Sequence, residues 1–74
     1  MMLATIEKSV DALMPQVVRA IFSTDPMVRF MAAHAMGTAE TRNASVIRAL
    51  KRARRDSYAM VRAEASTSLA KLNR

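Results

Sequence analysis

The sequence predicts an all-α fold, a short α-solenoid of four to five helices arranged as about two repeated units. Apolar residues recur at spacings of three and four along most of the chain, which is the period of amphipathic helices. A pattern of helix, turn and helix also occurs twice in the same order. Such units stack because one unit alone cannot bury its apolar face, and we expect a right-handed superhelix. Residues 1–74 are too few for a second core, so we expect a single domain.

The clearest repeat is a segment over residues 28–37 that returns 33 positions later over residues 61–69. Both copies begin with Val-Arg, continue with spaced alanine or serine residues, and reach a methionine or leucine near their end. An aspartate precedes each copy, Asp25 in the first and Asp56 in the second. The second helix of the repeated unit is therefore predicted in both copies.

The helices before these segments look alike as well. Residues 17–21 read Val-Val-Arg-Ala-Ile and residues 46–50 read Val-Ile-Arg-Ala-Leu. The first valine of this pattern precedes the Val-Arg pair by 11 positions in the first unit and by 15 in the second. We therefore expect the second unit to contain four extra residues, about one helical turn.

A first helix is predicted over residues 2–13, with an apolar face formed by Leu3, Ile6, Val10 and Leu13. Pro15 disfavours helical geometry at the residue before it. Two interpretations stay open: Pro15 kinks one continuous helix, or it lies in the first turn of a separate second helix. The buried side of the part after Pro15 is predicted to contain Val17, Val18, Ile21 and Phe22.

A third helix is predicted to begin after Asp25, whose carboxylate can accept hydrogen bonds from the free amides of the first turn. Pro26 suits the first helical position, where no donor is needed. Gly37 is predicted to end the helix with a left-handed residue. The predicted buried side contains Val28, Met31, Ala32, Ala35 and Met36.

A fourth helix is predicted over residues 44–55, after a polar link in which Thr41 and Asn43 are capping residues. A fifth helix is predicted to begin at a cap formed by Asp56 or Ser57. The predicted inward residues are Val46, Ile47, Leu50 and Ala53 in the fourth helix and Val61, Ala65, Leu69 and Leu72 in the fifth.

The repeated pattern resembles the HEAT or HEAT-like (PBS-lyase type) repeat over roughly residues 13–72. In that family an aspartate ends the turn between paired helices and a Val-Arg pair opens the second helix, which lines the concave side. The resemblance also implies a structural ladder between repeats, in which arginines pair with turn aspartates. Its members here are Asp25, Arg29, Asp56 and Arg62. Because the family is defined by its architecture, the resemblance implies a binding module and no particular reaction.

The composition argues against catalysis and against a metal or cofactor site. The chain has no cysteine, one histidine, one tyrosine and one glycine, so it lacks a thiol nucleophile, a Gly-rich phosphate loop and enough ligands for zinc. No apolar run approaches the roughly 20 residues that span a bilayer, and the N-terminus lacks a signal-peptide pattern. We expect a cytoplasmic protein that is not an enzyme, needs no cofactor and does not enter a membrane.

The main functional expectation is an adaptor or regulatory module that binds a protein partner or its own copy. Met27, Phe30 and His34 share one side of the third helix, and Met60 takes the corresponding place in the fifth. Methionines around an aromatic anchor suit peptide binding. The other interpretation is that a neighbouring helix or a second copy simply covers these side chains. Two repeats are fewer than a solenoid usually needs, so we also expect self-association.

The alternative function is that of a nucleic-acid-associated module. The net charge of +6 lies in the later part of the chain, because residues 1–25 have a net charge of −1 and residues 26–74 of +7. A basic stripe at helical spacing is formed by Arg48, Lys51, Arg52 and Arg55. Such a stripe is either a solvated helix face or a binding strip for an anion such as nucleic-acid phosphate. No aromatic residues are interleaved with it, which argues against stacked bases.

Overall fold

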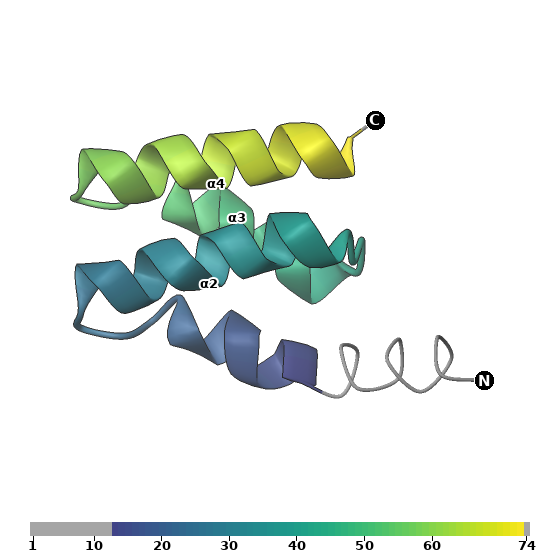
Figure 1. Ribbon diagram of the computed structural model, residues 1–74, viewed down its shortest axis with the longest axis horizontal. Coiled ribbons are helices and arrows are strands. Elements are labelled where there is room, and N and C mark those ends of the chain that lie inside the picture. The colour runs from purple at the N-terminus through teal and green to yellow at the C-terminus, as the bar shows by residue number, and fades with distance from the viewer. Residues whose placement is uncertain (1–12, 74) are drawn as a thin grey trace.

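The computed structural model describes residues 13–73, and this part of the chain contains helices and no strand. A helix over residues 13–20 is followed by α2 (Pro26–Ala39), α3 (Ala44–Ala53) and α4 (Ala59–Leu72). The helices α2 and α4 lie side by side and run in the same direction, with α3 returning behind them (Figure 1). The predicted stack of two helix pairs is confirmed, while the predicted helix over residues 2–13 lies outside the described residues.

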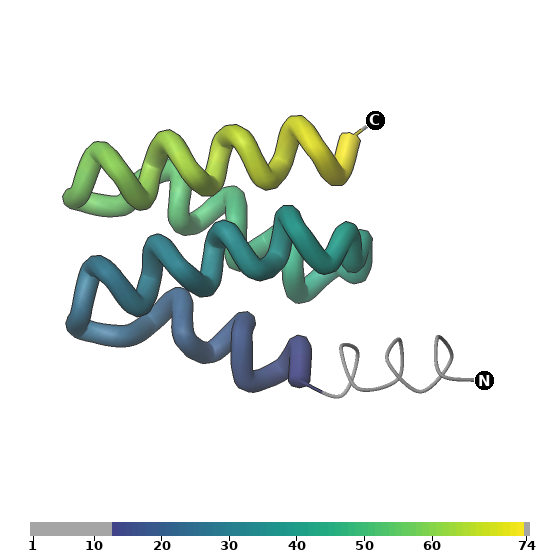
Figure 2. The backbone as a smooth tube through the Cα atoms, viewed as in Figure 1, coloured from purple at the N-terminus to yellow at the C-terminus, as the bar shows by residue number. Residues whose placement is uncertain are grey.

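The backbone trace shows two similar helix pairs stacked on one another (Figure 2). The helix over residues 13–20 and α3 end 33 residues apart, and α2 and α4 begin 33 residues apart. The predicted insertion of four residues is therefore wrong. A shift of four residues is close to one helical turn and leaves the apolar face unchanged, so apolar spacing cannot distinguish the two registers. In the observed register Ser23 corresponds to Asp56, and Asp25 corresponds to Tyr58.

The core lies between the helices and contains small and medium apolar side chains. The inward residues predicted for α3 and α4 are buried, except that Ile47 is partly buried. In α2, however, the expected core residues Val28 and Met31 are 38% and 61% exposed. Ala33 and Gly37 are buried instead, because α4 covers the side of α2 on which they lie.

Gly37 allows close packing within a helix and does not end one. The helix α2 continues to Ala39, and the left-handed residue that caps it is Glu40, with φ 56°. A Cβ atom on Gly37 would lie 2.4 Å from Oγ and 2.7 Å from Cβ of Ser68 on α4. The Ser68 hydroxyl donates a 2.6 Å hydrogen bond to the carbonyl oxygen of Ala33. The predicted helix end at Gly37 is therefore wrong. Glycine occupies this position because any side chain would collide with Ser68 on α4.

Two further residues that were expected in the core are exposed: Phe22 at 59% and Leu13 at 54%. After residue 20 the backbone winds more tightly, since the amides of residues 21–23 donate to carbonyl oxygens three positions earlier. This tighter winding turns Phe22 away from the side that an α-helical period predicts. Leu13 and Met14 are already helical, so Pro15 lies inside a helical segment and does not begin it.

The caps of α2 and α3 are those predicted from the sequence. Asp25 accepts a 2.9 Å hydrogen bond from the Met27 amide, and Pro26 is the first helical residue. Asn43 accepts a 2.9 Å hydrogen bond from the Val46 amide at the start of α3. Each cap satisfies an amide that has no partner within its own helix and stabilises it by about 1 kcal/mol.

Replacing Gly37 with alanine should destabilise the fold. Helix propensity alone would make this change stabilising by about 1 kcal/mol, whereas the contact with Ser68 makes it an overpacking change that costs about 1–3 kcal/mol. Urea denaturation followed by circular dichroism measures the sign. Ala70 is the exposed equivalent of Gly37 in α4, and Ala70→Gly is the control, for which we expect only the propensity cost. A stabilised Gly37→Ala variant would contradict the close packing described above.

Candidate functional site

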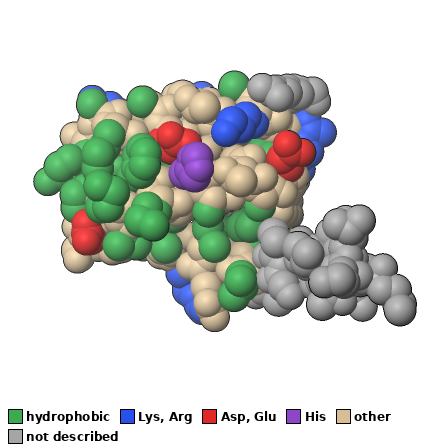
Figure 3. Space-filling view, viewed as in Figure 1, with side chains coloured by type: hydrophobic (Ala, Val, Ile, Leu, Met, Phe, Trp, Pro, Cys, Tyr) green, Lys and Arg blue, Asp and Glu red, His purple; other side chains and the backbone are tan. Residues whose placement is uncertain are grey.

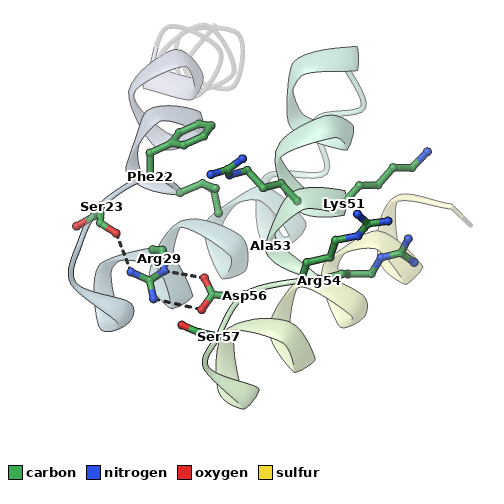
Figure 4. A pocket seen from close by; sticks show the side chains of 11 residues that line it. Phe22, Ser23, Arg29, Lys51, Ala53, Arg54, Asp56 and Ser57 are labelled. Carbon is green, nitrogen blue, oxygen red and sulfur yellow. Dashed lines mark hydrogen bonds and ion pairs between the residues drawn. The ribbon is translucent and has the colours of Figure 1, made fainter.

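An ion pair between Arg29 and Asp56 joins the two helix pairs at the end of the molecule where α2 and α4 begin. Arg29 Nε donates to Asp56 Oδ2 at 2.6 Å, and Arg29 Nη2 donates to Asp56 Oδ1 at 3.2 Å. Arg29 Nη1 donates to the carbonyl oxygen of Ser23 at 2.8 Å (Figure 4). The side chains of Arg29 and Asp56 are only 14% and 9% exposed. One guanidinium therefore binds the turn of its own unit and the turn of the next.

The other two predicted ladder residues have different contacts. Asp25 uses its carboxylate to cap α2, and Arg62 Nη1 donates to the carbonyl oxygen of Asp56 at 2.7 Å. The predicted cap of α4 by Asp56 or Ser57 is wrong, because α4 begins after Tyr58 and has no side-chain cap. Asp56 Oδ1 instead accepts a 2.9 Å hydrogen bond from the Tyr58 amide, and this bond stabilises the turn before α4.

The ion pair changes the proton affinity of both partners. The hydrogen bond from the Arg29 guanidinium lowers the pKa of the Asp56 carboxyl below its usual value of 3.8, and burial only partly opposes this. The hydrogen bond to Asp56 in turn raises the pKa of Arg29. Both groups therefore stay charged through the neutral range.

A second contact joins α2 and α4 on the face of the molecule that is shown in Figure 3. His34 Nδ1 on α2 lies 3.0 Å from Glu64 Oε2 on α4, and Thr38 Oγ1 lies 3.4 Å from His34 Nε2. Phe30 precedes His34 by four residues, and Met60 precedes Glu64 by four. Because the two helices run in the same direction, Phe30 and Met60 lie about one turn nearer the helix starts than the His34–Glu64 pair.

This surface, which we term the α2/α4 face, brings together the four residues predicted for partner binding. Met27 is 51% exposed and Met60 39%, while Phe30 is partly buried and packs on the core. Apolar side chains gather beside the histidine over the first halves of both helices (Figure 3). Phe30 therefore differs from Met27 and Met60, because its ring is partly covered by the core of the same chain.

Sequence reasoning missed one member of the α2/α4 face, Glu64, whose carboxylate contacts His34. The equivalent of Glu64 in the first unit is Met31, which is 61% exposed although helical spacing placed it with the core residues. Glu64 could not be chosen from the sequence, because nothing along the chain relates it to His34, which lies 30 positions away.

The basic residues of α3 and of the turn after it lie on a different surface. The helix α3 ends at Ala53 and not at residue 55 as predicted. All four members of the predicted stripe are exposed. Three of them line an open groove of about 840 Å³ between the end of α3 and the turn after residue 20, and Arg48 does not. We term this the basic groove. Its lining includes Phe22, Ser23, Lys51, Arg52, Arg54 and Arg55.

The basic groove contains the aromatic side chain of Phe22, which helical spacing predicts in the core. The guanidinium carbon of Arg52 lies 4.7 Å from the centroid of the Phe22 ring, a cation–π contact between the two helix pairs. Among the described residues of the lining, Asp56 is the one carboxylate, and Arg29 already binds it. The four cations at the end of α3 therefore face the groove without a competing free carboxylate.

The described residues contain little that could hold a metal ion. Within residues 13–73, no three His, Cys, Asp or Glu side chains gather closely enough for metal binding. In the same residues no helix is long and apolar enough to cross a membrane. The chemistry that the described surface does offer is apolar contact on the α2/α4 face and anion binding in the basic groove.

Comparison with known proteins identifies a family. Residues 1–70 match the family model of the HEAT repeats, so the match includes both helix pairs and nearly the whole chain. HEAT repeats commonly mediate protein–protein interaction, and their fold is generally a non-catalytic scaffold. Neither the curated proteins nor the solved structures searched contain a match to this chain.

Asp56→Asn should remove a pH-dependent part of the stability. The folded-state pKa of Asp56 is lowered, so its contribution is present above the unfolded-state pKa and is lost as pH falls through the folded-state pKa. We expect the wild type to be more stable than Asp56→Asn near neutral pH and this difference to shrink below the usual aspartate pKa of 3.8. Urea denaturation across this range measures it. Parallel pH profiles for the two proteins would contradict the role assigned to the ion pair.

Proposed function

Because the chain belongs to the HEAT repeat family, as the sequence resemblance predicted, we propose that it is a non-catalytic adaptor or regulatory module that binds a partner protein. The proposed site is the α2/α4 face, with Met27, Phe30, His34 and Met60 as contact residues. The observation that carries the proposal is the exposed apolar surface beside the His34–Glu64 pair. A bound apolar segment of the partner would remove this surface from water, which is the main source of free energy in protein association.

The composition of the α2/α4 face suits an apolar segment with a polar flank. Methionine side chains are unbranched and adapt to the shape of a partner, and the partly buried Phe30 supplies a rigid anchor. The His34–Glu64 pair lies next to them and offers polar groups to the edge of the bound segment. The partner we expect is an amphipathic helix that places apolar side chains over Phe30 and Met60.

A second copy of the chain is the other occupant that the sequence predicts for this face. Two copies that meet through the same surface would form a two-fold dimer. Sedimentation of the purified chain separates these cases. A dimer that Met27→Lys disrupts identifies the face as a self-interaction surface. A monomer at high concentration leaves the partner protein as the occupant.

The basic groove supports a second candidate function, the binding of nucleic acid. Lys51, Arg54 and Arg55 offer charges for phosphates, and Phe22 is 59% exposed beside Arg52. An aromatic ring next to cations is the combination that binds single-stranded nucleic acid through stacking and charge. No aromatic residue is interleaved with the basic stripe along the chain, because Phe22 comes from a different helix pair.

Binding of a partner protein should depend on the α2/α4 face and tolerate salt. Met27→Lys places a charge on the apolar surface, and we expect it and Phe30→Ala to weaken binding by about tenfold or more. Leu13→Lys is the matched control, because Leu13 is 54% exposed and Met27 51%. A quantitative pull-down from cells of origin at low and high salt identifies the retained partner. Titration of that partner with each variant then measures the change in affinity. Equal retention by Met27→Lys and Leu13→Lys would exclude this site.

Binding of nucleic acid should instead depend on the groove and on salt. For about four phosphate contacts to a single strand, the association constant should fall by nearly 10³ for each tenfold rise in salt. Fluorescence anisotropy with labelled single-stranded oligonucleotides measures it. We expect Lys51→Glu with Arg55→Glu to abolish binding. Arg48→Glu with Lys71→Glu has the same charge change outside the groove and should retain most of it. Equal losses in the two double variants would show that only net charge matters.

A further inference from the structure

The contact between α2 and α4 uses three positions of α2 that we term the inner seam: Arg29, Ala33 and Gly37. They are spaced by four residues and therefore lie along one side of the helix. Arg29 binds the Asp56 carboxylate, the Ala33 carbonyl accepts from Ser68, and Gly37 lies directly against Ser68. The inner seam thus combines one guanidinium with two small residues that allow a helix to approach closely.

The same pattern occurs on α4, where no part of the described chain covers it. The constant 33-residue period places Arg62, Ser66 and Ala70 at the positions of the inner seam. All three are exposed. They lie on the side of α4 opposite to α2, because their helical positions differ by about half a turn from that of Glu64. In Figure 1 this side of α4 forms the outer edge of the molecule. We term these three residues the outer seam.

The Arg62 side chain is held in the same way as Arg29. Each uses Nη1 to bind the carbonyl oxygen of the residue six positions earlier, at 2.8 Å for Arg29 and 2.7 Å for Arg62. In Arg29 the other donors, Nε and Nη2, bind the Asp56 carboxylate. The corresponding donors of Arg62 have no hydrogen-bond partner within residues 13–73. The carbonyl of Asp56 therefore fixes a guanidinium whose carboxylate-binding edge is open.

We propose that the outer seam binds another helix-pair unit, one whose turn carries a carboxylate at the position that Asp56 occupies here. A guanidinium edge with two parallel donors matches a carboxylate bidentately. Ser66 and Ala70 leave room for a helix that follows this acidic turn, as Ala33 and Gly37 do for α4. This surface lies apart from the α2/α4 face, so the proposal stands whether or not the proposed function holds.

A second wild-type copy does not fit this description. The residue that corresponds to Asp56 in the first unit is Ser23. Its hydroxyl is uncharged and already accepts a 3.1 Å hydrogen bond from the Asp25 amide. Head-to-tail stacking of wild-type chains therefore lacks the carboxylate for Arg62. The occupant is accordingly a helix-pair unit with an acidic turn residue, and Ser23 prevents the chain from stacking on itself.

The variant Ser23→Asp is a direct probe of the outer seam. An aspartate fits this turn, because Asp56 accepts from the amide two residues later just as Ser23 does. Combined with Arg62→Gln, the variant offers an acidic turn but has no guanidinium in its own outer seam. Mixed with the wild-type chain, it should form a closed one-to-one complex. Wild-type Arg62 would bind the introduced carboxylate, and neither remaining end could add a further chain.

Sedimentation and isothermal titration calorimetry test this. We expect a one-to-one complex between the wild type and the Ser23→Asp/Arg62→Gln variant, weakened at least about tenfold when Arg62→Gln replaces the wild type. The control variant Ser23→Asn/Arg62→Gln keeps the turn but carries no charge, and it should not bind. Ser23→Asp alone should form open chains whose mean mass rises with concentration. Circular dichroism confirms that each variant is folded. Absence of the one-to-one complex, or a complex equally strong with Ser23→Asn, would overturn the proposal.

Discussion

The bidentate contact between Arg29 and Asp56 is the constraint on which the stacking of the two helix pairs depends. It links the turn of one unit to the turn of the next and is largely shielded from water. A charge placed there without its partner would be costly, so the contact favours one register of α4 against α2. Small residues farther along both helices then allow the close approach that buries the apolar core.

This stacking separates the chemistry of the molecule into distinct surfaces. Apolar side chains of α2 and α4 meet on one face beside the His34–Glu64 pair. The cations at the end of α3 line a groove with Phe22 on another. Each surface takes residues from both helix pairs, so neither exists in a single unit. A small HEAT repeat protein can in this way offer different kinds of contact from only a few turns of helix.

Much of the architecture was predictable because it rests on local rules. The helix pairs, the cap at Asp25 and the inward residues of α3 and α4 follow from apolar spacing and from the hydrogen-bonding preferences of short polar side chains. The errors have two origins. The expected helix end at Gly37 and the burial of Phe22 were each inferred within one helix, and each was corrected by a contact with another helix or by the winding of a turn. The repeat was misplaced by four residues because apolar spacing is nearly the same after one helical turn, and the observed helix bounds corrected it.

The sequence by itself determined that this chain is all-α, that it contains two similar helix pairs, and that its positive charge lies after the first 25 residues. Periodicity and composition are properties of neighbouring residues, so they can be read along the chain. Only the tertiary structure decided that Arg29 binds Asp56 and that Phe22 contacts Arg52 of α3. It also decided that Arg62 makes the same backbone hydrogen bond as Arg29. These are distances between residues about 30 positions apart or between equivalent turns, and a linear pattern does not contain them.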